Sequence, residues 1–256
     1  MSFVKQLLSS VGIGAAKVDT ILLNSRYAPG DTINATVLIK GGKNTQAIDA
    51  IYFSVHCTYD EEDDDGNIVE RVCTLDKTQI GEHFSIAPGQ EQEFQVQLKL
   101  PYNTPLTGGN SQVWIATGLD IRFALDPKDK DRIEVVPNNL IGNLFDAFAE
   151  LGLEPITAHS IKTRCPLRSG LPFAQIFSFK ATSGKYRSRL DEVELIFTCY
   201  EEHLDAFIEL ETKTHGVSGW LADKLDLNES KTKLCITRDD IENLPMLLND
   251  FIASSL

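Results

Sequence analysis

The sequence has few cysteines, and none of them pair at short spacing. There are five in 256 residues, at Cys57, Cys73, Cys165, Cys199 and Cys235, and no two form a Cys-x-x-Cys clip. Because the number is odd and the chain is not small, a disulfide framework is disfavoured. Buried free thiols in a reducing compartment are the simpler prediction.

Long hydrophobic runs are also missing. No stretch of about 20 apolar residues occurs, although such a stretch is needed to cross a bilayer as a helix. The first residues, Met1–Leu8, carry one lysine and a broken apolar run, so they do not read as a secretory signal. We therefore expect a soluble, cytoplasmic protein.

Positive charge is in short supply. Twenty-four Lys and Arg stand against 37 Asp and Glu, which gives a net charge of −13. Such a field repels nucleic-acid phosphates and anionic lipids, so nucleic acid is excluded as a partner and membrane docking is disfavoured. Two local basic groups, Lys185–Arg189 and Lys128–Arg132, are interleaved with or flanked by acids and indicate a mixed-charge surface.

The dominant pattern in the sequence is an alternation of apolar and polar residues. Alternation places one set of side chains on a core face and the other in water, as in antiparallel sheets with one solvated face. Turn residues such as Ala28–Asp31 and Ala87–Gly89 separate these runs. The predicted core faces include Ile33, Ala35, Val37, Ile39, Ile51, Phe53, Val55, Cys57, Tyr59, Val193, Leu195, Phe197 and Cys199. The fold class is therefore mainly β, with sandwiches.

Three segments have helical spacing instead. They are a short amphipathic helix over residues 3–11, a linker helix over about 139–152 that ends at Gly152, and a C-terminal helix over about 241–252. Thr237–Asp240 resembles a capping box before the last helix, and Pro245 kinks or restarts it. The length fits two domains. We expect boundaries at 1–137, 138–153 and 154–256, with a β-sandwich on each side of the linker helix.

One acidic segment, Asp60–Asp65, resembles a calcium loop. Counted from Glu61, acids stand at the first, third and fifth positions and Gly66 at the sixth, but the twelfth is Val72, where a bidentate glutamate should stand. The flanking residues read as strands rather than helices. A β-hairpin with an Asp65-Gly66 turn is the preferred interpretation, and weak calcium binding remains an open alternative.

The other chemical motifs fail on order or spacing. Gly12–Lys17 resembles a phosphate loop, but helix, glycines and strand occur in the reverse order. Gly216–Gly219 is one residue short of a nucleophile elbow. The histidines, at His56, His83, His159, His203 and His215, show no zinc-ligand spacing, and His56 and Cys57 point to opposite sheet faces. We therefore predict no catalytic, cofactor-binding or metal-binding residues and no cofactor.

Several strings together resemble one family. The sequence is similar to the bacterial sporulation-control stage-zero M family, of the arrestin-like superfamily, at Tyr27–Asp31, Leu100–Leu106, Val113–Ile121, Ala124–Asp129, Gly170–Gln175 and Leu190–Leu195. The resemblance implies two arrestin-like sandwiches, no enzymatic activity, and a regulatory or scaffolding role in bacterial developmental or cell-cycle control. It carries over no catalytic residue.

The sequence thus favours a protein that binds other proteins. The groove between the domains and the exposed edge strands are the expected surfaces, because an extended segment can add to a strand edge. Two alternatives stay open. One is a structural homo-oligomer, such as a homodimer, that pairs through the linker or C-terminal helix. The other is an enzyme whose site assembles from dispersed residues.

Overall fold

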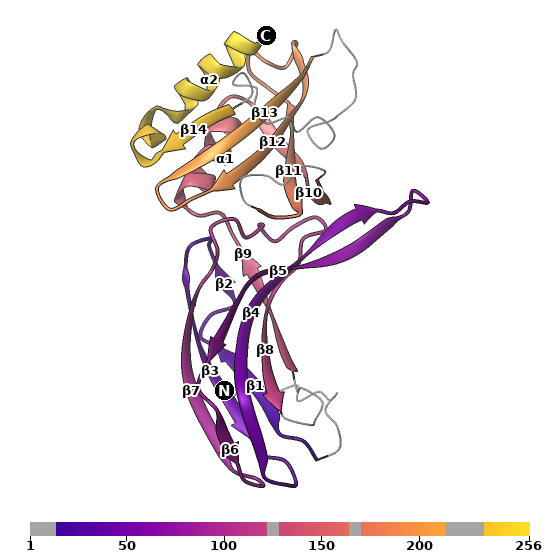
Figure 1. Cartoon of the computed structure of the whole chain (residues 1–256). Helices are drawn as coiled ribbons and strands as arrows, with labels where there is room; N and C mark the ends of the chain where they lie inside the picture. Colours follow the sequence, from indigo (N-terminus) through magenta and orange to yellow (C-terminus); the bar gives the residue numbers. More distant parts are fainter. Residues whose placement is uncertain (1–13, 122–127, 164–169, 213–232) are drawn as a thin grey trace.

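The computed structural model describes residues 14–121, 128–163, 170–212 and 233–256. It is mainly β, as predicted, with an N-terminal part of long strands and a C-terminal part of strands and helices stacked on it (Figure 1). The predicted helix over residues 3–11 lies outside the described residues. The strands are Lys17–Leu22 (β1), Arg26–Tyr27 (β2), Thr32–Lys40 (β3), Gln46–Glu62 (β4), Ile68–Ile80 (β5), Phe84–Ile86 (β6), Glu91–Lys99 (β7), Val113–Ile121 (β8), Lys128–Val135 (β9), Leu153–Lys162 (β10), Phe173–Ala181 (β11), Leu190–Cys199 (β12), His203–Thr212 (β13) and Lys233–Thr237 (β14).

The N-terminal part contains a three-stranded antiparallel sheet in the order β1-β3-β7. Ile33, Ala35, Val37 and Ile39 on β3 are buried, while the alternate residues Asn34, Thr36 and Leu38 are more exposed. The same alternation on β4 buries Phe53 and Val55. The two core faces belong to one hydrophobic cluster, so the predicted core alternation is confirmed here.

The remaining strands form an eleven-stranded sheet. Its path is β14-β13-β12-β11-β10-β4-β8-β9-β2, and β5 and β6 pair with β4. The sequence predicts antiparallel pairing, but two short pairings of described strands are parallel. β2 pairs with β9, and β10 pairs with β4 at Ile161 and Asp60 alone. That single pair of residues joins the strands of the two parts.

The first helix, α1, covers Asn139–Glu150, close to the predicted 139–152. Asn138 caps its N-terminus, because its side-chain oxygen accepts a hydrogen bond from the Ile141 backbone at 3.0 Å. Gly152 follows its C-terminus with a φ of 79°, a conformation that favours glycine. α1 packs on β10, β13 and the C-terminal helix, all in the C-terminal part.

The C-terminal helix restarts at the predicted proline. A 3-10 turn over Arg238–Asn243 (η1) precedes α2, Leu244–Ser255, which has proline in its first turn. The Asp240 carboxylate accepts hydrogen bonds from the Thr237 backbone N–H at 2.8 Å and from the Thr237 hydroxyl at 2.6 Å. These bonds hold the pKa of Asp240 below its usual range. The predicted capping interaction is therefore present.

The C-terminal part, as far as the structure describes it, has one sheet rather than the two of a sandwich. One face of β11–β14 packs under α1 and α2, through residues that include Phe179, Leu195 and Leu248. A smaller apolar cluster of Ala174, Ile176, Ile196 and Phe207 lies apart from that core. Neither described helix is long and apolar enough to cross a membrane.

Three acids, Asp19, Asp129 and Asp131, lie near one another where β1 contacts β9. Asp129 accepts a hydrogen bond from the Thr20 backbone at 2.7 Å, and Asp131 lies two residues along β9 on the same side. Burial, followed by the charge and hydrogen bond of Asp129 and the charge of Asp19, raises the pKa of Asp131 to about 7. The folded protein therefore keeps a proton on Asp131 at a pH where the unfolded chain has lost it.

This proton predicts a loss of stability as pH rises. Between the unfolded pKa near 4 and the folded pKa of about 7, the folded state binds more protons, so the free energy of unfolding falls as pH increases. Asp131→Asn removes the dependence and stabilises the protein at pH 8 by about 1–2 kcal/mol, after allowance for screening at this half-exposed site. Urea denaturation of both proteins at pH 5 and pH 8 measures the difference. An equal gain from Glu70→Gln, at an exposed acid of β5, would contradict the assignment.

Candidate functional site

Two side-chain amides tie the N-terminal part to the C-terminal sheet. Asn110, in the loop before β8, donates to the Ser160 carbonyl at 2.8 Å and accepts from the Ser160 N–H at 2.7 Å. Gln175 on β11 makes the same double contact with the Leu106 backbone, at 2.8 Å for each bond. A carboxamide has the donor and acceptor of a peptide group. Each one therefore bonds the backbone of the other part as a peptide group would.

Two serine hydroxyls complete this junction. The hydroxyls of Ser111 and Ser160 lie 2.6 Å apart and both residues are buried. Gln175 also donates to the Ser111 hydroxyl at 3.2 Å. A buried polar group that lacks partners is costly, and these groups satisfy one another. We call the set of Leu106, Asn110, Ser111, Ser160 and Gln175 the junction clamp.

Gly109 brings the two parts into backbone contact. Its φ is +57°, and a Cβ built on it would lie 1.8 Å from the Ala158 carbonyl oxygen. No side chain fits in that space. Glycine at this position therefore allows the loop to reach β10 and allows the neighbouring Asn110 to bond with Ser160.

An open apolar groove of about 450 Å³, which we call the junction groove, lies beside the clamp. Its lining comprises Leu106–Gly108, Glu134–Pro137, Phe145, Pro155–Ala158, Gln175, Phe177 and Phe179. The pairing of β10 with β11 shifts register between Pro155 and Thr157, so Ile156 stands out as the extra residue of a bulge. Ile156 is 51% exposed at the rim of this groove.

Aromatic rings form the groove's inner wall. Phe145 on α1 lies over the sheet with its ring 5.2 Å from Phe177, 5.9 Å from Phe179 and 6.3 Å from Phe197. Among the described lining residues, Glu134 is the one ionisable side chain, and it pairs with Arg26 at 3.7 Å. The groove is therefore suited to apolar contact and offers no pair of acid–base groups.

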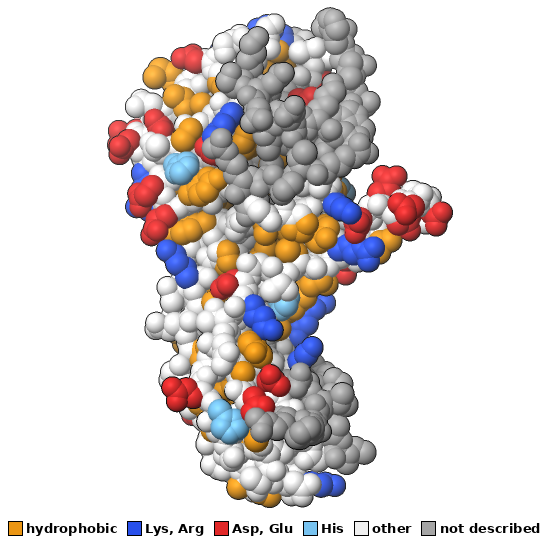
Figure 2. Space-filling view, viewed as in Figure 1, with side chains coloured by type: hydrophobic (Ala, Val, Ile, Leu, Met, Phe, Trp, Pro, Cys, Tyr) orange, Lys and Arg blue, Asp and Glu red, His pale blue; other side chains and the backbone are white. Residues whose placement is uncertain are grey.

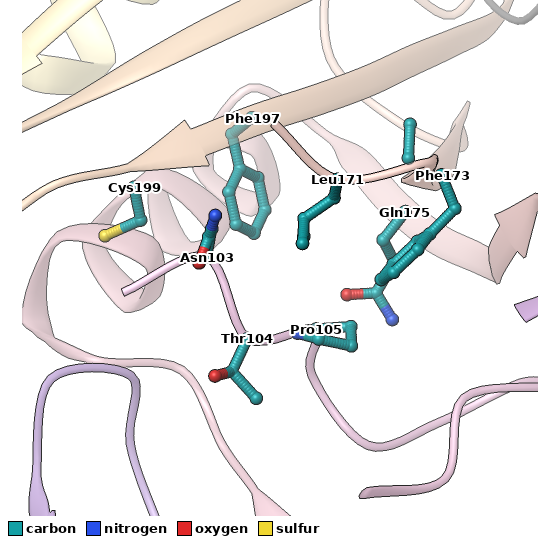
Figure 3. Close-up of a pocket in the computed structure, with 9 residues that line it drawn as sticks. Asn103, Thr104, Pro105, Leu171, Phe173, Gln175, Phe197 and Cys199 are labelled. Carbon is teal, nitrogen blue, oxygen red and sulfur yellow. The ribbon is translucent and has the colours of Figure 1, made fainter. Parts of the chain in front are cut away.

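A smaller pocket lies on the other side of Gln175 (Figure 3). Asn103, Thr104 and Pro105 face Leu171, Phe173, Phe197 and Cys199 across it. Its volume of about 30 Å³ is room for one or two water molecules. It is too small for a substrate.

The acidic segment that resembles a calcium loop is the tip of a hairpin. β4 and β5 meet there, Gly66 has a φ of 81°, and Figure 2 shows acidic side chains gathered on the projecting tip. Asp63 Oδ1 accepts hydrogen bonds from the backbones of Asp65 at 3.0 Å and Asn67 at 2.8 Å, and the Asn67 bonds lower the pKa of Asp63. The hairpin interpretation is confirmed, and this carboxylate holds the turn.

The structure also places His56 and Cys57 as expected, on opposite faces of β4. His56 stacks on Trp114 at 5.5 Å, and Lys130 lies 3.6 Å from the centre of that indole ring. Burial, and then Lys130, lowers the pKa of His56. Cys57 is fully buried opposite Cys73, and both thiols are free. Burial raises the pKa of Cys57 far above its ordinary value.

Other sequence motifs can be placed only in part. Gly14 is described and has a φ of 100°, but Gly12 lies outside the described residues. The segment Gly216–Gly219, His215 and Cys165 lie outside them as well.

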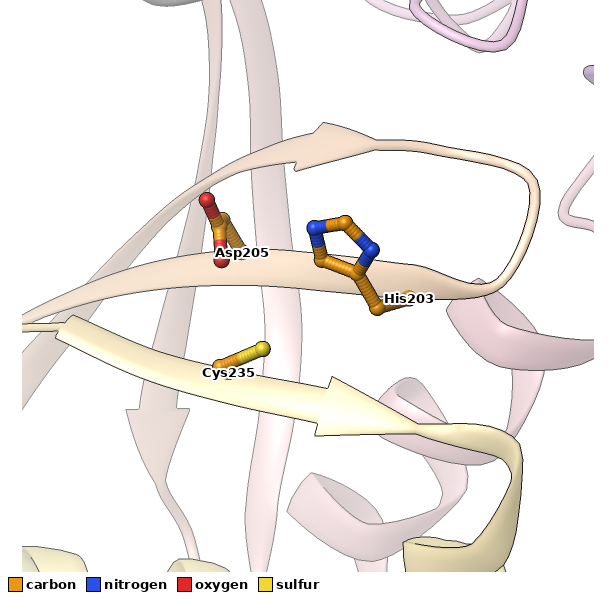
Figure 4. Close-up of side chains that lie close together, drawn as sticks. All are labelled: His203, Asp205 and Cys235. Carbon is orange, nitrogen blue, oxygen red and sulfur yellow. The ribbon is translucent and has the colours of Figure 1, made fainter.

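Sequence spacing missed one cluster of ligand-type side chains. His203, Asp205 and Cys235 converge on β13 and β14 (Figure 4). Cys235 is distant in sequence, so no local motif relates it to the other two. The sequence does show that His203 and Asp205 share one face of a strand. That spacing suggests a ligand pair only when the strand that carries Cys235 is known to lie beside it.

Comparison with known proteins gives one consistent relationship. Residues 4–214 match the family described as SpoOM protein, Spo0M. The chain is 36% identical over 243 residues to the sporulation-control protein spo0M of Bacillus subtilis strain 168, which covers 95% of this chain and 93% of that protein. The crystal structure of the sporulation control protein Spo0M from Bacillus subtilis superposes with a TM-score of 0.83 at 34% identity, over 95% of this chain and 100% of that one. The chain therefore belongs to the Spo0M family.

Proposed function

We propose that this chain is a non-enzymatic regulator in sporulation control that binds an extended segment of another protein in the junction groove. The Bacillus subtilis relative, a sporulation-control protein that matches nearly the full length, supports the regulatory role. The site's chemistry supports a binding role. We propose the cytoplasm as its location, in keeping with its free thiols.

The observation that carries this proposal is the groove's form. It is open, aromatic on its inner wall, and bordered by Pro155–Ala158 of β10. Among the described strands, β10 pairs with β11 on one side and meets β4 on the other at Ile161 alone. Asn110 and Gly109 cover this edge at Ser160 and Ala158, so the stretch left for an added strand is the bulge over Pro155–Thr157, and the aromatic wall can take its apolar side chains. Ile156 at the rim gives the partner a further apolar contact.

A finer assignment of the fold is also proposed. The N-terminal part has two sheets that share a core, and its Tyr27–Asp31 turn is held by the Ala28 N–H, which donates to Asp31 Oδ2 at 2.7 Å. These features support an arrestin-like relationship there. We place the end of the N-terminal domain at residue 137, with α1 leading into the C-terminal domain from residue 154.

A photo-crosslinking amino acid at position 156 tests the proposed surface. In cells of a spore-forming host, we expect covalent adducts with a protein partner from Ile156 and none from Met246, a 60% exposed apolar residue on α2. Ile156→Asp should remove the partner from pull-downs, because a carboxylate is costly to bury in an apolar contact. Met246→Asp is the matched control. Equal adducts from both positions, or none from position 156, would rule out the groove.

The regulatory role needs a separate test. In a Bacillus subtilis strain that lacks spo0M, this chain should change spore yield relative to the empty vector, and Ile156→Asp should not. Yields that match the empty vector for the unaltered chain count against the proposed role. If the unaltered chain and Ile156→Asp give the same spore yield, and this yield differs from that of the empty vector, the result counts against the groove.

A further inference from the structure

Side chains of three ligand types lie on one face at the outer edge of the C-terminal sheet. His203 and Asp205 stand two residues apart on β13 and therefore project to the same side. In the pairing of β13 with β14, Asp205 is directly opposite Cys235, and His203 is opposite Thr237. The imidazole, carboxylate and thiol thus converge across two strands, as Figure 4 shows.

The spacing of these groups is close to that of metal ligands. One ligand atom from each residue lies within 4.8 Å of the others. Bonds of about 2.0–2.3 Å in a tetrahedral zinc site place ligand atoms roughly 3.5 Å apart. Cys235 is exposed and His203 is partly exposed, so rotation of these two side chains can close the remaining distance, while Asp205 is 3% exposed and fixed.

One cation already lies at this site. Lys233, two residues before Cys235 on β14, places its ammonium 2.8 Å from Asp205 Oδ2. That ion pair accounts for the buried Asp205 carboxylate. The Cys235 thiol also hydrogen-bonds Asp205, and the His203 ring stacks on Tyr200 at 4.5 Å. These separate contacts leave the imidazole, carboxylate and thiol close enough together to share one ion. A metal at this site would take the place of the thiol proton and compete with the Lys233 ammonium for the Asp205 carboxylate.

We propose that His203, Asp205 and Cys235 bind a thiophilic divalent cation, of which Zn²⁺ is the model, with water as the fourth ligand. The sulfur ligand favours zinc-type ions over calcium or magnesium, which prefer oxygen alone. The metal would link β14, the end strand of the sheet, to β13. The site is distinct from the junction groove, so neither proposal depends on the other.

Cobalt substitution tests the site directly. Co²⁺ added to the reduced full-length protein should produce the near-ultraviolet charge-transfer band of a thiolate–cobalt bond and the visible bands of tetrahedral coordination. Cys235→Ser should abolish the charge-transfer band. Cys73→Ser, at a partly buried thiol on β5, is the control and should retain it.

Zinc titration calorimetry provides the second readout. His203→Asn and Cys235→Ser should each weaken zinc binding by at least about tenfold, because a three-residue site loses one ligand. His83→Asn is a matched control. His83 also lies beside a carboxylate, Asp49, at 2.9 Å, but among the described residues it belongs to no cluster of three metal-ligand side chains. Lys233→Gln should strengthen binding, since it removes the competing charge from Asp205.

The results separate a site from a fortuitous cluster. Circular dichroism first establishes that each variant is folded. Absence of the thiolate–cobalt band in the unaltered protein overturns the proposal whatever the variants do. So does a Cys235→Ser protein with unchanged zinc affinity, or a Lys233→Gln protein that binds no more tightly.

Discussion

Gly109→Ala should lower the thermal unfolding midpoint by about 6–12 °C, the shift that a loss of roughly 3 kcal/mol gives in a chain of this size. Two costs add. A φ of +57° disfavours any residue with a Cβ by about 1–3 kcal/mol, and the new methyl would lie 1.8 Å from the Ala158 oxygen. Either the loop or β10 must move, which strains the bonds between Asn110 and Ser160.

Gly89→Ala separates the two costs. Gly89 has a similar φ of +68°, but a Cβ there would meet nothing within 4 Å. This control therefore reports the conformational cost alone. Scanning calorimetry of both variants gives the contribution of the junction contact as their difference. Equal midpoints would mean that the approach of Gly109 to Ala158 contributes nothing to stability.

Phe148→Ala is expected to destabilise the protein by about 3–5 kcal/mol, the usual cost of removing a buried phenylalanine ring. Phe148 is fully buried on α1, and its ring stacks on Phe179 at 4.5 Å with an interplanar angle of 22°. Helix and sheet would then enclose a cavity. Met246→Ala, at an exposed position of α2, should change stability by less than about 0.5 kcal/mol.

Phe148→Ala also tests whether the N-terminal and C-terminal parts unfold together. Core residues of β3 and of α1 belong to one continuous cluster that passes through the junction. Hydrogen exchange should therefore show a loss of protection on β3 as well as on β11 in Phe148→Ala. Retained protection on β3 beside loss on β11 would mean two independent units, with the junction as a weak contact.

The sequence predicts those features that repeat at short range. Alternation in Ile33–Ile39 identified the core face of β3, because neighbouring strand residues point to opposite sides. The capping of η1 could be predicted because Thr237 and Asp240 are three residues apart, so the hydrogen bond between them forms within one turn of the chain. Gly152 likewise marked the end of α1.

The candidate site could not be predicted in the same way. Asn110 and Ser160, or Leu106 and Gln175, are distant in sequence, and a lone amide or serine has no periodic signal. Their roles appear only when β10 and the loop before β8 are brought together. The bulge at Ile156 and the parallel pairing of Ile161 with Asp60 are also products of tertiary structure. Alternating strands in the sequence also do not show which layer covers them, so the packing of the described strands β11–β14 under α1 and α2 could not be predicted.

The length and pairing of β4 have a consequence for synthesis of the chain. One of its edges is covered at once by β5, its hairpin partner, but the other awaits β8, where Ile51 pairs with Leu119 and Phe53 with Thr117. Until those later residues leave the ribosome, a long apolar strand has one unpaired edge. Such edges recruit strands from other nascent chains. The interval between emergence of β5 and emergence of β8 is therefore the period in which this protein most needs chaperone protection.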